Sequence, residues 1–268
     1  MKVYKTKLPK ANENLLHKRS FIACISELGT RHGQMTTPAE YIVKDILDHL
    51  GGLVNKAQEI RNNIPVDMLV GDARHVCLSG IQTSLEPVML AFGAIECTNQ
   101  CIPDIDLTRV SGIKKRTNKE QLDNFDTWAK LTILVFTHFR LESMFLNLLS
   151  SIDPTQADTR GFELITTKLF DRITVTEKDE KKDCLKVMTV MRNSLHNNSV
   201  NKNASIDKTI KGKRFELIKN QNTHSTIFDI IFFIDCSLDI IEEVINAPEV
   251  LRLPTPIPDQ FHLNLSGA

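Results

Sequence analysis

The chain has 268 residues, which is long enough to bury a hydrophobic core without disulfides or structural metals. Its 33 basic residues balance its 33 acidic residues, so net charge argues neither for nor against a nucleic-acid partner. Such a partner would have to be held by a local basic patch. With 41% hydrophobic and 25% charged residues, the composition is that of an ordinary globular protein.

The cysteines indicate a reducing compartment. They are scattered, and several lie among apolar residues, so we interpret them as reduced and buried in a cytoplasmic protein. The six are Cys24, Cys77, Cys97, Cys101, Cys184 and Cys236. Cys97 and Cys101 have no second Cys or His pair at ligand spacing nearby, so we expect no metal and no cofactor. The N-terminus lacks a signal-peptide pattern, and acidic residues interrupt the most apolar stretch, 227–245, so we expect no membrane contact.

The first half of the chain predicts helices and one linker. A helix is expected to start at Thr37-Pro38, because Thr is a common cap and Pro is tolerated in the first turn. Gly51-Gly52 is expected to interrupt this helix, and a second helix is expected from about Ser84. The loop-like segment 101–119 carries the basic run Lys114-Lys115-Arg116, which we interpret as a solvated linker.

The second half predicts a bundle. Apolar residues recur at helical spacing in four segments, and one segment alternates as strands do. We expect helices at 126–150, 161–173, 177–197 and 225–246, and a β-hairpin at 206–218. The fold class is therefore mostly α, an antiparallel helical bundle with a small inserted β-hairpin. We expect three parts: a helical region of unknown role (1–120), the bundle (121–247) and a Pro-rich extended tail (248–268).

One segment near the end of a predicted helix combines groups suited to phosphate chemistry. Arg192 and His196 are four residues apart, so their side chains share one helix face. A guanidinium neutralises and orients a phosphate, and an imidazole moves a proton near neutral pH. Asn193 and Asn197, also four apart, add amide donors and acceptors on the adjoining face.

A structural interpretation of the same residues stays open. Asn197-Asn198 would end a helix, because Asn tolerates the left-handed conformation, and His196 near a helix C-terminus suits the helix dipole. On the preceding long helix, Glu142 interrupts an apolar stripe and needs a cation, for which Arg192 is the candidate. His138, one turn earlier, is interpreted as a hydrogen-bonded histidine of the core or surface.

The order of these elements resembles the HEPN superfamily, and within it an uncharacterised bacterial branch with an Arg-Asn-Ser-x-His-Asn-Asn signature. The resemblance covers about residues 125–247. It rests on a helix bearing Phe139-Arg140-Leu141-Glu142, a short helix, a helix ending in the segment 192–198, a hairpin and a long apolar helix. It implies a helical bundle that forms homodimers and has an RNA substrate, an antitoxin or a nucleotidyltransferase as further partners.

The resemblance also implies roles for particular residues. Carried over by position, the catalytic candidates are Arg192, His196 and Glu142, and the binding candidates are Asn193, Asn197 and Asn198. In ribonucleases of this superfamily the motif Arg and His meet across a dimer cleft. This chain departs from the pattern in two places. Only three residues separate Arg192 from His196, fewer than is usual, and Ser199 stands where a Gly is expected.

Three functions are compatible with the sequence. The first is a metal-independent endoribonuclease of a toxin–antitoxin or antiphage defence system. The second is a catalytically silent helical module that binds RNA, a nucleotide or a protein partner. The third makes Arg192 and Glu142 a buried ion pair that fixes helix register. The chain has no glycine-rich phosphate loop, zinc-finger spacing or nucleophile elbow, which disfavours kinases, dehydrogenases and hydrolases.

Overall fold

The computed structural model describes residues 38–64, 71–101 and 118–259. Residues 43–268 group by their contacts into one compact unit. Its elements in chain order are α2 (Pro38–Asn62), α3 (Ala73–Cys101), α5 (Asn118–Ile152), η2 (Pro154–Gln156), α6 (Phe162–Phe170), α7 (Lys178–His196), β1 (Ile206–Ile210), β2 (Lys213–Leu217), α8 (Ile227–Ile245) and α9 (Pro248–Leu251).

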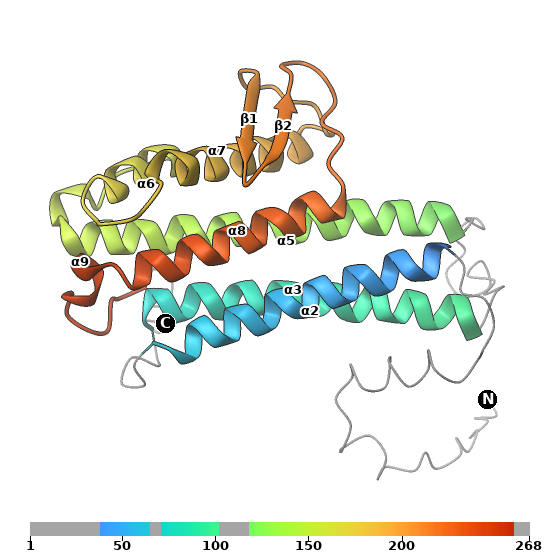
Figure 1. Ribbon diagram of the computed structural model, residues 1–268, viewed down its shortest axis with the longest axis horizontal. Coiled ribbons are helices and arrows are strands. Elements are labelled where there is room, and N and C mark those ends of the chain that lie inside the picture. The colour runs from blue at the N-terminus through green and yellow to red at the C-terminus, as the bar shows by residue number, and fades with distance from the viewer. Residues whose placement is uncertain (1–37, 65–70, 102–117, 260–268) are drawn as a thin grey trace, which may run out of the picture. The chain divides into compact units, whose positions relative to one another are not determined.

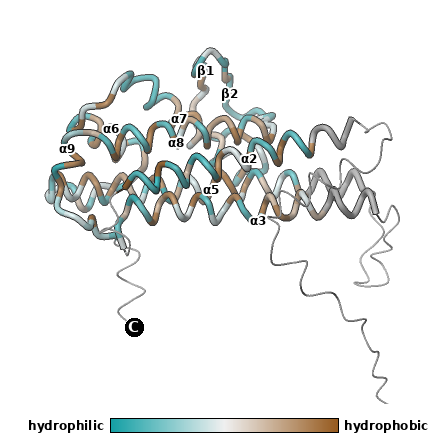
Figure 2. Tube along the Cα trace, turned by 60° about the horizontal axis from the view of Figure 1, so that its bottom comes forward, coloured by the Kyte–Doolittle hydropathy of each residue, from teal (hydrophilic) through white to brown (hydrophobic). Residues whose placement is uncertain are grey.

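The bundle is organised around α5, which contacts α3, α6, α7 and α8 (Figure 1). Hydrophobic positions recur along these helices and alternate with hydrophilic ones (Figure 2), as helices that bury one face require. Leu141, Phe145 and Leu149 of α5 are fully buried. The helix α8 begins at a capping box, in which the Thr226 side chain accepts from the Asp229 amide and the Asp229 carboxylate accepts from the Thr226 amide.

The predicted fold class is confirmed. Among the described residues the only sheet is the hairpin β1–β2, whose strands pair antiparallel from Ile206 with Leu217 to Ile210 with Lys213. The turn residues Lys211 and Gly212 both have positive φ, of 45° and 77°, as two-residue hairpin turns need. The hairpin packs on α7, and its buried residues Phe215 and Ile210 complete that side of the core.

Two predictions for the first half are wrong. Gly51-Gly52 does not interrupt α2, which continues to Asn62. Leu50 and Leu53 on either side of the glycines are buried, and their packing outweighs a helix-propensity cost of about 1 kcal/mol per glycine. The helix expected from Ser84 begins eleven residues earlier, at Ala73. The predicted linker lies almost wholly outside the described residues, as does its basic run.

The contacts unite parts of the chain that the sequence analysis assigned to different segments. Residues 43–101 belong to the same compact unit as the predicted bundle, because α3 packs along α5. One window of α3, Ala73–Ala94, is apolar and long enough to cross a membrane, but half of it is buried inside the protein, and core helices of soluble proteins have the same property.

The tail is only partly extended. The prediction is wrong for Pro248–Leu251, which forms α9, because Pro at the first position of a helix loses no hydrogen bond. Further along, Ile257 and Asp259 exchange backbone hydrogen bonds with residues 71–73. The carboxylate of Asp72 accepts from the Ile257 amide at 2.9 Å and from the Arg74 guanidinium at 2.8 Å, so a buried ion pair fastens the tail to the start of α3.

Candidate functional site

The helix α7 positions Arg192 and His196. Its buried face contains Cys184, Met188 and Met191, as predicted, and packs against α5 and α8. Arg192 lies beside this face and is half-buried, whereas His196 in the last turn is exposed. Their side chains therefore stand one helical turn apart, one near the core and one in solvent.

Arg192 contacts a histidine of α5. Its Nη2 atom lies 3.5 Å from Nε2 of His138, whose side chain is 2% exposed. The same Nε2 lies 3.0 Å from the hydroxyl oxygen of Thr189. That hydroxyl also lies 2.8 Å from the Leu185 carbonyl oxygen, to which it donates. Nε2 of His138 therefore contacts both the Arg192 guanidinium and the Thr189 hydroxyl, and its role in each contact depends on the tautomer of the ring.

His138 is uncharged in this setting. Burial, and secondarily the charge of Arg192, lowers the pKa of His138 to about 3. Its ring also packs against the ring of Phe162 from α6, with centroids 4.5 Å apart. The expected hydrogen-bonded histidine is thus confirmed, and it is a core residue.

The predicted ion pair between Glu142 and Arg192 is wrong. Among the described residues neither side chain forms a salt bridge with the other, and the nearest basic atom to Glu142 is Nδ1 of His138, 3.9 Å from Oε2. His138 lies one helical turn before Glu142 on α5. It is His138 that contacts α7. Glu142 is 34% exposed and keeps contact with solvent, so its position in an apolar stripe does not bury its charge.

Arg192 lacks an anion. Within the part of the chain that the structure describes, it forms no salt bridge, and its Nε–H is buried with no acceptor. Burying a guanidinium without a counter-charge is unfavourable, and a planar fork of donors matches a carboxylate or phosphate. Among the residues that the structure describes, the side chain therefore has the properties of an anion site without its ligand.

The helix α7 ends at the asparagines that follow His196. Asn197 caps α7, because its side-chain amide donates to the Asn193 carbonyl oxygen at 2.8 Å. Asn198 and Ser199 follow with positive φ of 54° and 63°, so they end the helix as the structural interpretation proposed. Ser199, in place of the expected Gly, adopts the left-handed conformation too, and its carbonyl oxygen accepts from the Thr223 amide at 2.7 Å.

Asn193 lines a cavity of about 500 Å³ between α6, α7 and the segment before β1. Two buried polar atoms of its wall, Oγ1 of Thr166 and Nδ2 of Asn203, have no hydrogen-bond partner. Thr189, which also lines the cavity, joins it to the His138–Arg192 contact. The sequence does not reveal this cavity, because its walls come from three separate elements and only Asn193 belongs to the segment 192–198.

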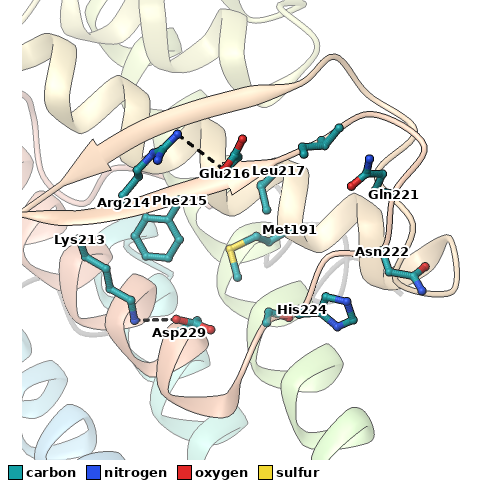
Figure 3. Close-up of a pocket in the computed structure, with 12 residues that line it drawn as sticks. Met191, Lys213, Arg214, Phe215, Glu216, Leu217, Gln221, Asn222, His224 and Asp229 are labelled. Atoms are coloured by element: carbon teal, nitrogen blue, oxygen red, sulfur yellow. Dashed lines mark hydrogen bonds and ion pairs between the residues drawn. The ribbon is translucent and has the colours of Figure 1, made fainter.

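A second cavity, of about 360 Å³, lies beneath β2 (Figure 3). Its charges are already paired: Lys213 binds Asp229 at 2.6 Å, and Arg214 binds both Asp207 and Glu216. In Figure 3, Phe215 and Met191 occupy the space between β2 and the helices. This cavity therefore offers no uncompensated charge to a ligand, unlike the surroundings of Arg192.

No group of three or more His, Cys, Asp or Glu side chains that could hold a metal ion occurs among the described residues. A scan against protein-family models and searches of curated proteins and of solved structures found no match.

Proposed function

We propose that this protein is a HEPN-like RNA-binding protein that holds an RNA phosphate at Arg192. The observation that carries the proposal is the half-buried guanidinium without a carboxylate partner among the described residues. A phosphate would compensate its charge and accept from the unpaired Nε–H together with an Nη group, in the bidentate geometry that Arg favours.

The neighbouring cavity supports RNA as the source of that phosphate. A volume of about 500 Å³ is within the range of small-ligand sites, so it has room for a nucleobase. Proteins that recognise single-stranded RNA hydrogen-bond the edges of its bases. Asn193, Asn203 and Thr166 offer amide and hydroxyl groups for such contacts.

Metal-independent cleavage of RNA is the second candidate function, and it depends on His196. This histidine is exposed one turn after Arg192 and forms no hydrogen bond among the described residues. In the proposed reaction the RNA 2′-hydroxyl attacks the adjacent phosphorus and the 5′-oxygen leaves. His196 transfers the proton as general acid or base, and Arg192 stabilises the charge of the phosphorane. Glu142 lies across His138 from Arg192 and is not placed to share that role directly.

The resemblance adds a homodimer and an antitoxin or nucleotidyltransferase partner to the proposal, and the scattered, reduced cysteines add a cytoplasmic location. An exposed apolar face supports self-association: Trp128 and Phe136, eight residues apart on one face of α5, are 48% and 51% exposed. Light scattering of the purified full chain tests the dimer, and a monomer at micromolar concentration would contradict it.

The binding proposal is tested by fluorescence anisotropy with a short fluorescein-labelled single-stranded RNA. Arg192→Gln should weaken binding about tenfold or more, because a hydrogen bond to a charged group is lost, and should reduce the slope of log affinity against log salt by roughly one. Arg160→Gln is the matched control, since Arg160 is 73% exposed and lies outside the cavity. Equal affinities for Arg192→Gln and wild type would overturn the proposal.

A further inference from the structure

Two cysteines from different helices meet beside a cavity. Cys184 of α7 and Cys236 of α8 are both free and 3% exposed. They come from helices that pack against each other. Both side chains line a cavity of about 280 Å³, which also contains Lys211 from the hairpin turn. A small reagent that enters this cavity therefore meets two sulfurs side by side.

We propose that Cys184 and Cys236 form a redox-active dithiol that hydroperoxides oxidise to a disulfide between α7 and α8. The packing of α7 on α8 brings both cysteines to one cavity, and the cavity gives a water-sized oxidant access to otherwise buried sulfurs. This site is separate from Arg192 and does not depend on the proposed RNA-binding function.

The surroundings assign different roles to the two sulfurs. The hydrogen bond from Cys184, and to a smaller extent the ammonium of Lys211, lower the pKa of Cys236, although burial and the carboxylates of Asp235 and Asp239 oppose this. The same hydrogen bond, together with burial, raises the pKa of Cys184. Cys236 is therefore the attacking thiolate and Cys184 the resolving thiol.

The reaction has two steps. The Cys236 thiolate attacks one oxygen of the hydroperoxide, the O–O bond breaks, and the leaving alkoxide takes up a proton to give an alcohol and a sulfenic acid on Cys236. The Cys184 sulfur then attacks the sulfenic sulfur. The S–O bond breaks, and the hydroxyl group leaves as water with the Cys184 proton. Two thiols and one hydroperoxide thus give a disulfide, an alcohol and water.

The disulfide would close a loop that contains the helix end 192–198 and the hairpin. Because α7 and α8 already contact each other, the bond would tether them without a large rearrangement. The oxidised protein should therefore keep its helical content and unfold at a higher temperature than the reduced protein.

The test is oxidation of the folded full-length protein with hydrogen peroxide, followed by peptide mass spectrometry without reductant. The expected product is a Cys184–Cys236 disulfide, reversed by dithiothreitol. Cys184→Ser should leave a sulfenic acid on Cys236 that dimedone traps, whereas Cys236→Ser should leave Cys184 unmodified. Cys77→Ser is the matched control: Cys77 is equally buried, burial raises its pKa to about 12, and the variant should oxidise as wild type does. Failure of the disulfide to form in folded wild-type protein, or dimedone labelling of Cys184 in place of Cys236, would overturn the proposal.

Discussion

The guanidinium of Arg192 lies against the buried imidazole of His138, with Nη2 3.5 Å from Nε2. Since the low pKa of His138 keeps the ring neutral near pH 7, the contact places a cation beside an uncharged group. Within the described ranges no carboxylate compensates the positive charge of Arg192, so a ligand could do so. The same contact separates Arg192 from Glu142, which explains why the expected ion pair does not form.

The buried His138 should make the protein less stable in acid. Its pKa is about 3 in the folded protein against about 6.5 unfolded, so only the unfolded chain takes up a proton between these values. Above pH 6.5 the neutral His138 makes its full contribution to the free energy of unfolding. This contribution is lost as pH falls toward 3, at about 1.4 kcal/mol per pH unit.

The measurement is urea unfolding at several pH values between 7 and 4.5. His138→Gln removes the titrating group, so its free energy of unfolding should fall less steeply with acidification than that of wild type. His224→Gln, at an exposed position, should keep the wild-type slope. The same slope in His138→Gln and wild type would show that His138 is protonated in the folded state.

His196→Ala should abolish RNA cleavage if the protein is a ribonuclease. Loss of a general acid or base lowers the rate by roughly 10² to 10⁴, and EDTA should have no effect. The fold should persist, because His196 is exposed at the end of α7. The assay compares wild type, His196→Ala and the control His224→Ala on one labelled RNA, with helicity checked by circular dichroism. A folded His196→Ala protein that cuts at the wild-type rate removes this residue from the mechanism.

Asp72→Asn should strongly destabilise the protein. Asp72 and Arg74 form an ion pair in which both side chains are almost fully buried, so the substitution removes one partner of a buried pair, at a cost of about 3–5 kcal/mol. It should also free the tail, because the Asp72 carboxylate accepts from the Ile257 amide. Denaturant unfolding gives the first quantity, and limited proteolysis after residue 252 gives the second.

The control for this prediction is Asp207→Asn. Asp207 and Arg214 form an ion pair of the same length, 2.8 Å, but both side chains are more than half exposed. Exposed pairs contribute about 0–1 kcal/mol, so this variant should unfold close to wild type. Similar losses in the two variants would mean that burial of the Asp72 pair does not determine its contribution.

Two glycine substitutions in helices should have opposite effects. A Cβ at Gly80 of α3 would lie 2.3 Å from Nε of Arg140, so Gly80→Ala forces the Arg140 side chain to move and should destabilise by about 1–3 kcal/mol. A Cβ at Gly52 of α2 meets nothing within 4 Å, so Gly52→Ala should stabilise by about 0.5–1 kcal/mol through backbone entropy. Thermal unfolding of the two variants tests both. Stabilisation by Gly80→Ala would show that α3 and α5 pack less closely at Arg140.

The local pattern of apolar and polar residues in the sequence by itself determined where most helices and strands of this protein form. Apolar spacing places α5, α7 and α8 within a few residues of where they form, apart from the N-terminal end of α5, and alternation around Lys211-Gly212 predicts the hairpin. These signals are local, because helix and strand periodicity follow from which face of a short segment is buried. The same local signal was wrong at Gly51-Gly52, since packing of neighbouring leucines outweighs propensity.

Only the tertiary structure decided which groups meet. Arg192 and Glu142 are suitable partners by charge, yet the packing of α5 on α7 brings His138 to Arg192 first. The pairing of Cys184 with Cys236, and the cavity lined by Thr166 and Asn203, likewise combine residues from separate elements. The sequence specifies the chemistry of each side chain, but the crossing of helices sets which side chains lie within hydrogen-bonding distance, and one sequence pattern is compatible with several crossings.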